Sequence, residues 1–595
     1  MEPKAKLCCE ISWEVCNKVG GIYTVVSSKA QRMVEHYKEK YFAIGPYFPA
    51  KALGNFEEKV PPDSCKQVFE TLKSEGIECH YGTWLIKGNP NAILIDFSNF
   101  AKHKDGIKSF LWDTYKIDSL GTDYYDFDEP VVWAWAAGKL AERLAAACEG
   151  SCVAQCHEWL AGGALLYLKS HNVRVATVFT THATMLGRTL ASEGILYRVI
   201  DTVDADEEAA KRGQGLKAKH LLEKASAQHC EIFTTVSEIT GMEAEKLLGR
   251  KPDVLLPNGL DMSRFPTFEE SSIKHKLMKS KIFDFLISYF FPYYSWDLDN
   301  TLVFFLAGRY EFHDKGIDIF IKALGKLNDR LKAENSEHTV VAFFWVPGDI
   351  KAIKPMLLES KTYYKDLKES IGDNLDEIEH NILHGLIANL PLTQEQLFNE
   401  DLRDDVKRKL LRFRRKGKPP IATHDLYNEP QDLITQTLLK LGLDNDADDR
   451  VKAVYYPIYL SGADNLLDLT YYEAMQGSHL GVFPSYYEPW GYTPLEAGAL
   501  SVPSVTTDLA GFGRFICTEC VPGPNPGIWV LKRWQHSDED VVDQLAEQMH
   551  YYATLPKEDR IDNKIAAREI AAMADWKSFI ERYIEAQNKA VEKLP

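Results

Sequence analysis

The order of apolar and polar segments in the first 260 residues predicts a parallel α/β sheet. Three apolar runs, "RVATVFTTHAT", "CEIFTTVSEIT" and "DVLLPNGL", each end in a polar tip. Strands that are apolar on both faces and alternate with helices are typical of parallel sheets, whose two faces are both covered. Ser237 follows the second run and is expected to cap the next helix. We therefore predict a Rossmann-like domain over residues 1–262.

The same pattern resumes after residue 300, where "TLVFFLAGRYEF", "TVVAFFWVPG", "HLGVFPS" and "VPSVTT" predict further strands. We predict a second Rossmann-like domain over residues 263–576, and we expect a last helix, 577–595, to pack back on the first domain. Ligands of open α/β sheets bind beyond the carboxyl ends of the strands. Two such sheets facing each other therefore predict a site in the cleft between them.

Residues 350–450 depart from this pattern. Apolar residues recur there at helical spacing, with charged residues on the other faces: Leu367, Ile371, Leu375, Ile378, Ile382 and Leu386. Two interpretations stay open. The segment is either a helical insertion with a solvated outer face or a helix-pairing surface for self-association.

Composition narrows the class of protein. The chain has 595 residues, 45% of them apolar and 26% charged, which is typical of a multidomain globular protein. Its formal net charge of −17 argues against nucleic-acid or anionic-membrane partners. No apolar run has the length of a membrane span, and the N-terminus has no signal-peptide core. We expect a cytoplasmic location.

The eleven cysteines follow no disulfide framework, so we expect reduced thiols. The pair Cys517-x-x-Cys520 has no second pair and no histidine cluster near it. We expect neither a zinc site nor a redox role there.

The stretch "FPSYYEPWGYTPLEAGAL" carries the strongest candidate chemistry. Thr493, Pro494 and Glu496 fit a capping box, with threonine as N-cap and proline at the first helical position. Glu488 has no such structural explanation. The amides from Gly491 to Thr493 begin a helix, and a helix N-terminus attracts phosphate. An acid beside such a helix start predicts a site for a sugar nucleotide.

Two other stretches fit a sugar nucleotide. "AGRYEFHDKG" places Arg309 and Lys315 at the end of a predicted strand, where two cations could neutralise a leaving diphosphate without a metal. Near the N-terminus, "KVGG" brings Lys18 and Gly21 before an apolar run. Glycines there would let the backbone approach a ligand closely, although a plain turn has the same sequence.

Taken together, "EVCNKVGGIYTVV", "HEWLAG", "FTTHATMLGR", "PNGL", "AGRYEFHDKG" and "HLGVFPSYYEPWGYTPLE" resemble the eukaryotic-type glycogen synthases, in order over nearly the whole chain. The resemblance implies a GT-B fold, two Rossmann-like domains around a cleft. It also implies transfer of glucose from UDP-glucose to the non-reducing end of an α-1,4-glucan, with retention and with no metal or cofactor.

The resemblance assigns roles residue by residue. Glu488, Glu496 and His182 match catalytic positions. The implied donor-binding residues are Arg309, Lys315, Arg188, Lys18, Gly21, Asn258, Tyr471, Gly491, Tyr492 and Thr493, with Tyr471 expected to stack on the uracil. His157 and Glu158 either line the acceptor cleft or form a packed, hydrogen-bonded corner.

Animal and fungal members of this family carry an arginine-rich helix near the C-terminus that senses glucose 6-phosphate. Here "PKEDRIDNKIAAREIAAMADW" lacks much of the arginine cluster. The positions that match the effector pocket are His275, Lys279, His479, Arg560 and Lys564. We expect glucose 6-phosphate to bind weakly, and control by phosphorylation is doubtful because no long serine-rich tail is present. The implied partners are a glycogen or other α-1,4-glucan primer, glycogenin, and further copies of the chain in a homotetramer.

Other functions stay open at this point. Starch synthases that use ADP-glucose, and sucrose or trehalose-phosphate synthases, share the K-x-G-G and E-x7-E elements. A nucleotide-sugar epimerase or hydrolase would need no glucan, and a non-catalytic glucan-binding subunit would not need Glu488, Arg309 and Lys315 together. The sequence does not choose between front-face attack and a covalent glucosyl intermediate.

Overall fold

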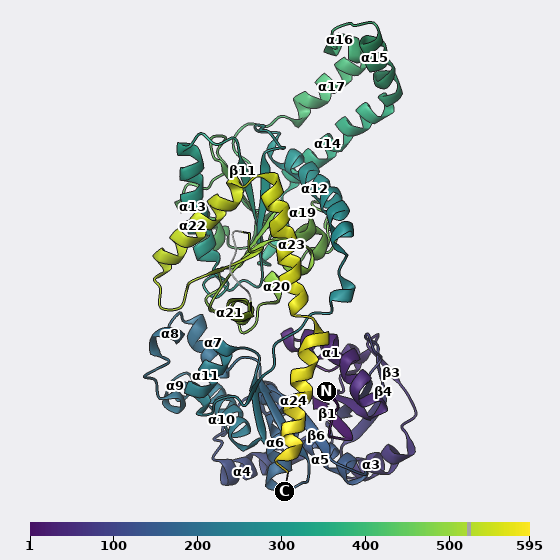
Figure 1. Cartoon of the computed structure of the whole chain (residues 1–595), viewed down its shortest axis with the longest axis vertical. Coiled ribbons are helices and arrows are strands. Elements are labelled where there is room, and N and C mark those ends of the chain that lie inside the picture. The colour runs from purple at the N-terminus through teal and green to yellow at the C-terminus, as the bar shows by residue number, and fades with distance from the viewer. Residues whose placement is uncertain (520–524, 595) are drawn as a thin grey trace.

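The computed structural model describes residues 1–519 and 525–594, so Cys520 of the Cys-x-x-Cys pair lies outside the described residues. Two α/β halves follow each other along the long axis of the molecule, and a helical arm extends from the C-terminal half (Figure 1). Within the described residues, no helix combines the length and apolarity that crossing a membrane requires.

The sheet of the N-terminal half has nine strands, of which only β4 runs antiparallel to its neighbours. In spatial order they are β3 (Phe56–Glu58), β4 (Glu78–Trp84), β5 (Asn91–Asp96), β2 (Tyr41–Pro46), β1 (Leu7–Ile11), β6 (Cys152–His157), β7 (Ala176–Thr181), β8 (Ile232–Thr235) and β9 (Val254–Leu255). Leu7, Cys9 and Ile11 of β1 pack into one core and Cys8 into another. The central strands are buried along their whole length because both faces of the sheet are covered.

Helices cover both faces of this sheet. They are α1 (Gly21–Tyr37), α2 (Pro49–Ala52), α3 (Asp63–Ser74), α4 (Lys104–Tyr115), α5 (Glu129–Ala146), α6 (Glu158–Ser170), α7 (Met185–Ser192), α8 (Leu196–Val199), α9 (Ala205–Lys211), α10 (Gln214–His229) and α11 (Glu238–Leu248). Ser237 caps α11 by accepting the amide of Thr240 at 3.3 Å, which confirms the prediction from sequence.

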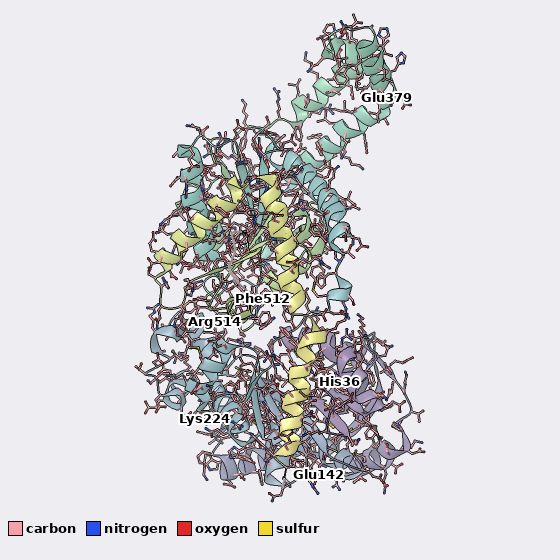
Figure 2. The ribbon with its side chains drawn as sticks, in the orientation of Figure 1. His36, Glu142, Lys224, Glu379, Phe512 and Arg514 are labelled. Carbon is pink, nitrogen blue, oxygen red and sulfur yellow. The ribbon has the colours of Figure 1, made fainter. Side chains whose placement is uncertain are left out.

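The sheet of the C-terminal half has six strands, all parallel. In spatial order they are β14 (Val451–Tyr455), β11 (Thr339–Trp345), β10 (Thr301–Ala307), β15 (Leu480–Val482), β16 (Ser504–Thr507) and β17 (Ile528–Leu531). Its helices are α12 (Phe268–Phe290), α13 (Ile317–Ala333), α19 (Tyr471–Gly477), α20 (Tyr492–Ala499), α21 (Gly511–Glu519), α22 (Asp538–Thr554) and α23 (Lys557–Met573). Figure 2 labels Phe512 and Arg514 of α21 next to the boundary between the halves.

The segment between β11 and β14 forms the arm. Its helices are α14 (Pro355–Asp373), α15 (Leu375–Ile387), α16 (Gln394–Leu397) and α17 (Glu400–Phe413), whereas α18 (Leu433–Lys440) packs against α13 and β14. A short antiparallel pair, β12 (Ile350–Ile353) and β13 (His424–Leu426), closes its base, which the sequence did not predict. The apolar positions at helical spacing lie on α14 and α15, separate helices that meet at Asn374. Helices α14 to α17 project away from the sheet, with Glu379 near the tip (Figure 2).

The last helix, α24 (Trp576–Glu592), leaves the C-terminal half and lies along the N-terminal half (Figure 1). It packs on β6, β7, β8 and α1. The Trp576 indole donates to the Ser28 hydroxyl at 2.8 Å, and Phe579, Tyr583 and Ile584 are buried in the core beneath it. The second face of the N-terminal sheet is therefore completed by the C-terminal end of the chain.

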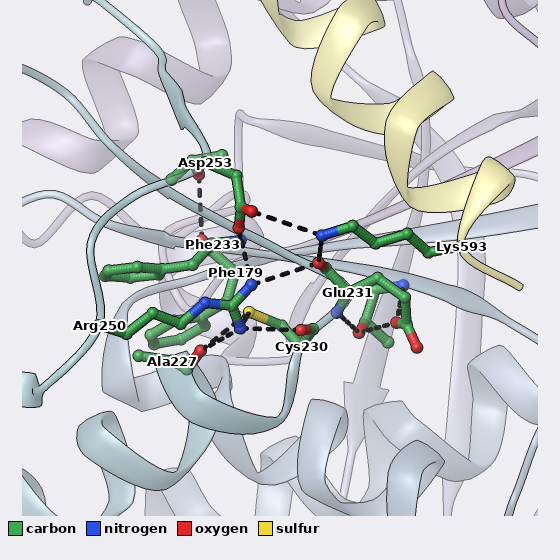
Figure 3. Close-up of polar contacts among 10 residues, drawn as sticks. Phe179, Ala227, Cys230, Glu231, Phe233, Arg250, Asp253 and Lys593 are labelled. Carbon is green, nitrogen blue, oxygen red and sulfur yellow. Dashed lines mark hydrogen bonds and ion pairs between the residues drawn. The ribbon is translucent and has the colours of Figure 1, made fainter.

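Charged side chains fasten the end of this segment to the sheet edge (Figure 3). Lys593 donates to the Glu231 carbonyl at 2.8 Å and lies 3.4 Å from Asp253. Asp253 also accepts from Arg250 at 2.7 Å and from the amide of Phe233 at 2.8 Å. These contacts tie residues 593 and 253 together across 340 positions of sequence.

Candidate active site

Loops at the carboxyl ends of β10 and β15 bring Lys315 and Glu488 together. The Lys315 Nζ atom lies 2.5 Å from Glu488 Oε2, and the two side chains are 17% and 20% exposed. They line one pocket with Ser485, Thr493 and Thr506. The two residues therefore line one pocket at strand ends. The pair places a cation and a carboxylate in partial shelter from water, where charge interactions are stronger than at an open surface.

A glycine sets the geometry of this loop pair. Gly316 has φ +67°, in the left-handed region, and a Cβ there would lie 2.0 Å from the Pro484 carbonyl oxygen. Only glycine permits this close approach of the two loops. Arg309, at the start of the first loop, is 68% exposed and pairs with Glu311 at 3.0 Å. Its guanidinium is thus positioned near the pocket but not fixed within it.

The predicted capping box at Thr493 is wrong. Helix α20 begins at Tyr492, with Gly491 as N-cap at φ +107°, and no side chain caps it. Because the glycine turns the chain two residues earlier than expected, Thr493 and Pro494 already lie inside the first turn. Glu496 then points away from the helix start. The amides at the start of α20 are therefore left without a side-chain cap on the pocket side, as an anion site requires.

Glu496 binds two tyrosines instead. It accepts from the Tyr472 hydroxyl at 2.8 Å and from the Tyr471 hydroxyl at 3.2 Å. Burial raises the pKa of Glu496 to about 7, although the two hydroxyls lower it. The structure thereby places Tyr471 and Glu496 in direct contact, on α19 and α20.

In the N-terminal half, His182 belongs to a buried chain of polar groups. Its Nε2 atom lies 3.0 Å from His157 Nδ1, and His157 Nε2 lies 2.7 Å from Glu10 Oε1. Lys29 and Tyr41 also bind Glu10. Burial, reinforced by His157, lowers the pKa of His182 well below its usual range, so its imidazole is neutral. A neutral His182 can donate or accept one hydrogen bond.

Glu10 and Lys29 were missed by the sequence reasoning, although a glutamate inside the apolar run "LCCEIS" is a signal. Both side chains are fully buried. Burial raises the pKa of Glu10, but Lys29 and His157 outweigh this effect and hold it at about 2. The carboxylate therefore fixes the orientation of His157, which in turn supports His182.

Glu158 and His157 occupy buried positions, 5% and 1% exposed. Glu158 starts α6 at φ +63° and accepts the amides of His182 at 2.8 Å and Ala183 at 3.1 Å. These contacts favour the packed, hydrogen-bonded corner over a lining of the acceptor cleft. Arg188, from α7, is exposed.

The N-terminal loop is held by a residue that the sequence reasoning did not single out. Glu14 accepts the amides of Gly20 at 2.7 Å and Tyr23 at 2.9 Å, while Lys18 and Gly21 are exposed. The loop is therefore preformed. Asn258 is buried, and its Oδ1 atom has no hydrogen-bond partner among the residues that the structure describes.

A second cluster gathers cationic and imidazole groups between α12, α23 and the loop before β15. His275 and His479 stack edge to face with ring centroids 5.4 Å apart. Lys279, Arg560 and Lys564 surround them, since each affects the pKa of His479. Burial, then Lys279 and Arg560, lowers the pKa of Lys564 to about 8. Within residues 1–519 and 525–594, no carboxylate forms an ion pair with these three cations.

Comparison of the fold with solved structures indicates the structural class of the protein. The catalytic domain of starch synthase IV from Arabidopsis thaliana, solved with ADP and acarbose, superposes with a TM-score of 0.52 at 12% identity, over 99% of this chain and all of that one. Two Rossmann-like domains around a cleft are the GT-B fold of glycosyltransferases, and the predicted fold class is confirmed.

Sequence comparison then gives the family. Residues 10–595 match the family model for glycogen synthase. The glycogen [starch] synthase of Neurospora crassa is 36% identical over 100% of this chain and 84% of its own length. The liver glycogen [starch] synthase of Mus musculus is 36% identical over 97% and 82%, and isoform 2 of Saccharomyces cerevisiae is 36% identical over 98% and 86%. The chain belongs to the glycogen synthase family, as its motifs predicted.

Proposed function

We propose that this enzyme transfers glucose from UDP-glucose to the non-reducing end of an α-1,4-glucan, with retention of configuration. The contact between Lys315 and Glu488 at the start of α20 carries the proposal. Lys315 and the free amides of α20 can bind a diphosphate, and the carboxylate of Glu488 can bind the sugar. A glucosyl transfer that passes through an oxocarbenium-like transition state needs both.

The leaving diphosphate gains negative charge as the glycosidic bond breaks. Lys315 and the first amides of α20 lie where they would stabilise this charge, and Arg309 would swing onto it from its exposed position. One such donor contributes about 3 kcal/mol to transition-state stabilisation. These groups supply positive charge from the chain itself, so we expect activity to survive chelation of divalent metals.

Glu488 and His182 would contact the sugar from opposite sides. Glu488, paired with Lys315, would orient the glucose and stabilise positive charge on it. Neutral His182 would hydrogen-bond a sugar hydroxyl, and Arg188, from the helix that follows the loop of His182, would add charge. In front-face attack the leaving phosphate takes the proton of the acceptor hydroxyl. A glucosyl adduct trapped on Glu488 would replace this route by a covalent one.

A donor and acceptor assay tests the function. The enzyme is incubated with labelled UDP-glucose or ADP-glucose, with and without glycogen, and in EDTA. Glycogen-dependent UDP release with label in polymer is the expected result. UDP release without glycogen would indicate a hydrolase or epimerase. Preference for ADP-glucose would indicate that the enzyme uses the donor of starch synthases. No turnover of either donor would indicate a non-catalytic glucan-binding subunit.

We also propose that the cluster of His275, Lys279, His479, Arg560 and Lys564 binds glucose 6-phosphate. The three cations have no carboxylate ion pair among the described residues, which leaves them available to a phosphate. The Nδ1 atom of His479 accepts the amide of Val303 at 3.0 Å, so its proton is on Nε2. Calorimetric titration with glucose 6-phosphate, using glucose as the uncharged control, checks this.

The arm is our candidate for assembly into a homotetramer. It exposes apolar side chains that a monomer leaves uncovered: Leu375, Leu383, Leu386, Ile387 and Leu411. Uncovered apolar helix faces mark association surfaces. We expect light scattering to give four copies, and fewer after charged substitutions at Leu386 and Ile387. The proposal includes glycogenin as a partner. It also includes a cytoplasmic location, since every described cysteine is a free thiol.

A further inference from the structure

The loop that carries His182 is held by three buried glutamates from three different helices. Four consecutive amides, those of residues 182–185, each donate to one of these carboxylates. Glu158 of α6 accepts from His182 and Ala183, Glu243 of α11 accepts from Thr184 at 3.1 Å, and Glu223 of α10 accepts from Met185 at 2.9 Å. All three glutamates are buried, at most 5% exposed. The loop is thus positioned by hydrogen bonds from its backbone amides to buried side chains rather than by packing alone.

Glu243 differs from the other two because it also contacts the opposite half of the molecule. Its Oε1 atom accepts from the Tyr487 hydroxyl at 3.1 Å, in addition to the amide and hydroxyl of Thr184. Tyr487 directly precedes Glu488 in the chain. One carboxylate oxygen therefore binds both the loop of His182 and the loop of Glu488.

The same face of α11 holds the residue after Glu488 as well. Ser237 and Thr240, at the start of α11, both direct their hydroxyls to the Pro489 carbonyl, at 2.7 Å and 3.4 Å. Residues 237, 240 and 243 are spaced three apart, so they lie along one side of the helix. Both neighbours of Glu488 are consequently held by α11, a helix of the other half.

A glycine makes room for this arrangement. A Cβ at Gly187 would lie 2.1 Å from Glu243 Oε1 and 2.5 Å from the Thr184 hydroxyl. Thr184 caps α7 by accepting the amide of Gly187 at 3.0 Å, and Arg188 follows in the first turn. The Glu243 carboxylate therefore reaches the start of α7 only because residue 187 has no side chain.

We propose that Glu243 is a positioning residue that aligns His182 and Arg188 with Glu488 when the cleft is closed. This inference rests on the proposed function of the site and adds the group that couples its two sides. Glu243 acts through Thr184 on one side and through Tyr487 on the other.

The Tyr487→Phe variant tests the coupling, because it removes only the hydroxyl that bridges the halves. We expect kcat to fall about tenfold, ~1.4 kcal/mol, with KM for glycogen and the melting temperature nearly unchanged. The matched control is Tyr486→Phe. That hydroxyl also crosses the interface, but it accepts only the amide of Tyr197 at 3.4 Å. The control should keep kcat within about twofold of wild type.

The Glu243→Ala variant and its double variant with Tyr487→Phe complete the cycle. Alanine removes the oxygen that accepts from both Thr184 and Tyr487, and we expect kcat to fall at least as far as in Tyr487→Phe. The double variant should be no slower than Glu243→Ala alone, since both changes break the contact between residues 243 and 487. Independent, multiplying effects would overturn the proposal, and so would a Tyr487→Phe enzyme as fast as the control. If Glu243→Ala does not fold, the two tyrosine variants decide the question. Absence of glucan transfer by the wild type would instead refute the proposed function.

Discussion

Replacing Lys315 with glutamine removes one of the two charges that meet at the start of α20. In the wild type, Lys315 Nζ lies 2.5 Å from Glu488 Oε2, with side-chain exposures of 17% and 20%. The substitution leaves Glu488 without its cation in a partly sheltered pocket. It also removes a cation from the position proposed for the leaving diphosphate.

The expected loss of stability lies between two limits. Breaking a fully buried ion pair costs about 3–5 kcal/mol, and an exposed pair contributes about 0–1 kcal/mol. With roughly four-fifths of each side chain covered, we expect a loss of about 2 kcal/mol, a fall of a few degrees in melting temperature. The expected loss in kcat is larger, about 10²–10³-fold, the usual effect of removing one donor to developing negative charge.

The assay is initial-rate transfer of label from UDP-glucose to glycogen, together with a thermal melt of each variant. Arg309→Gln is the matched control, because Arg309 is 68% exposed and pairs only with Glu311 among its described neighbours. It should lose about 10²-fold in kcat with no change in melting temperature. The Lys315→Gln, Glu488→Gln double variant should recover most of the stability and none of the activity, since no unpaired charge is left.

Two results would refute this reasoning. If Lys315→Gln keeps kcat within about threefold of wild type, Lys315 does not stabilise the leaving group. If Lys315→Gln and Arg309→Gln melt at the same temperature, the contact with Glu488 makes no net contribution to stability.

Three further predictions address other parts of the molecule. Glu496→Gln should lower the free energy of unfolding in denaturant by no more than about 1 kcal/mol, because the glutamine oxygen still accepts from one tyrosine. A larger loss, accompanied by fraying of α20, would show that Glu496 does cap this helix. Glucose 6-phosphate should bind more weakly as pH rises through about 8, where Lys564 loses its charge. The affinities measured at about pH 7 and pH 9 should differ several-fold in the wild type but not in Lys564→Ala. An equal pH dependence in both proteins would exclude Lys564 from the binding site. Gly259→Ala should destabilise the protein by about 1–3 kcal/mol, because a Cβ there would lie 2.7 Å from the Trp576 ring. An unchanged melting temperature would contradict the packing of α24 against this turn.

Local pattern was enough to predict much of this protein from its sequence. The strands β7, β8, β10 and β11 followed from apolar runs, because a strand between two covered faces is rich in apolar residues. The Ser237 cap followed from its place before a helix, since a hydroxyl there has only the first amides to bind. Glu488 stood out because no local structure accounted for it.

Local pattern failed where a side chain had a choice of partners. Thr493 and Glu496 have the spacing of a capping box, but Gly491 starts the helix earlier, and two tyrosines from α19 bind the carboxylate. The sequence contains both possibilities. Which one forms depends on the backbone angle at Gly491 and on the neighbouring helix.

The sequence by itself determined the family, the parallel sheets and the residues that could do chemistry, because each depends on residue type and short spacing. Only the tertiary structure decided which charges meet. Lys315 and Glu488 are 173 positions apart, and Glu243 and Tyr487 are 244 apart. A carboxylate in the interior is stabilised by whichever donors the fold places within about 3 Å, and that distance is set by packing of whole sheets and helices rather than by the sequence on either side.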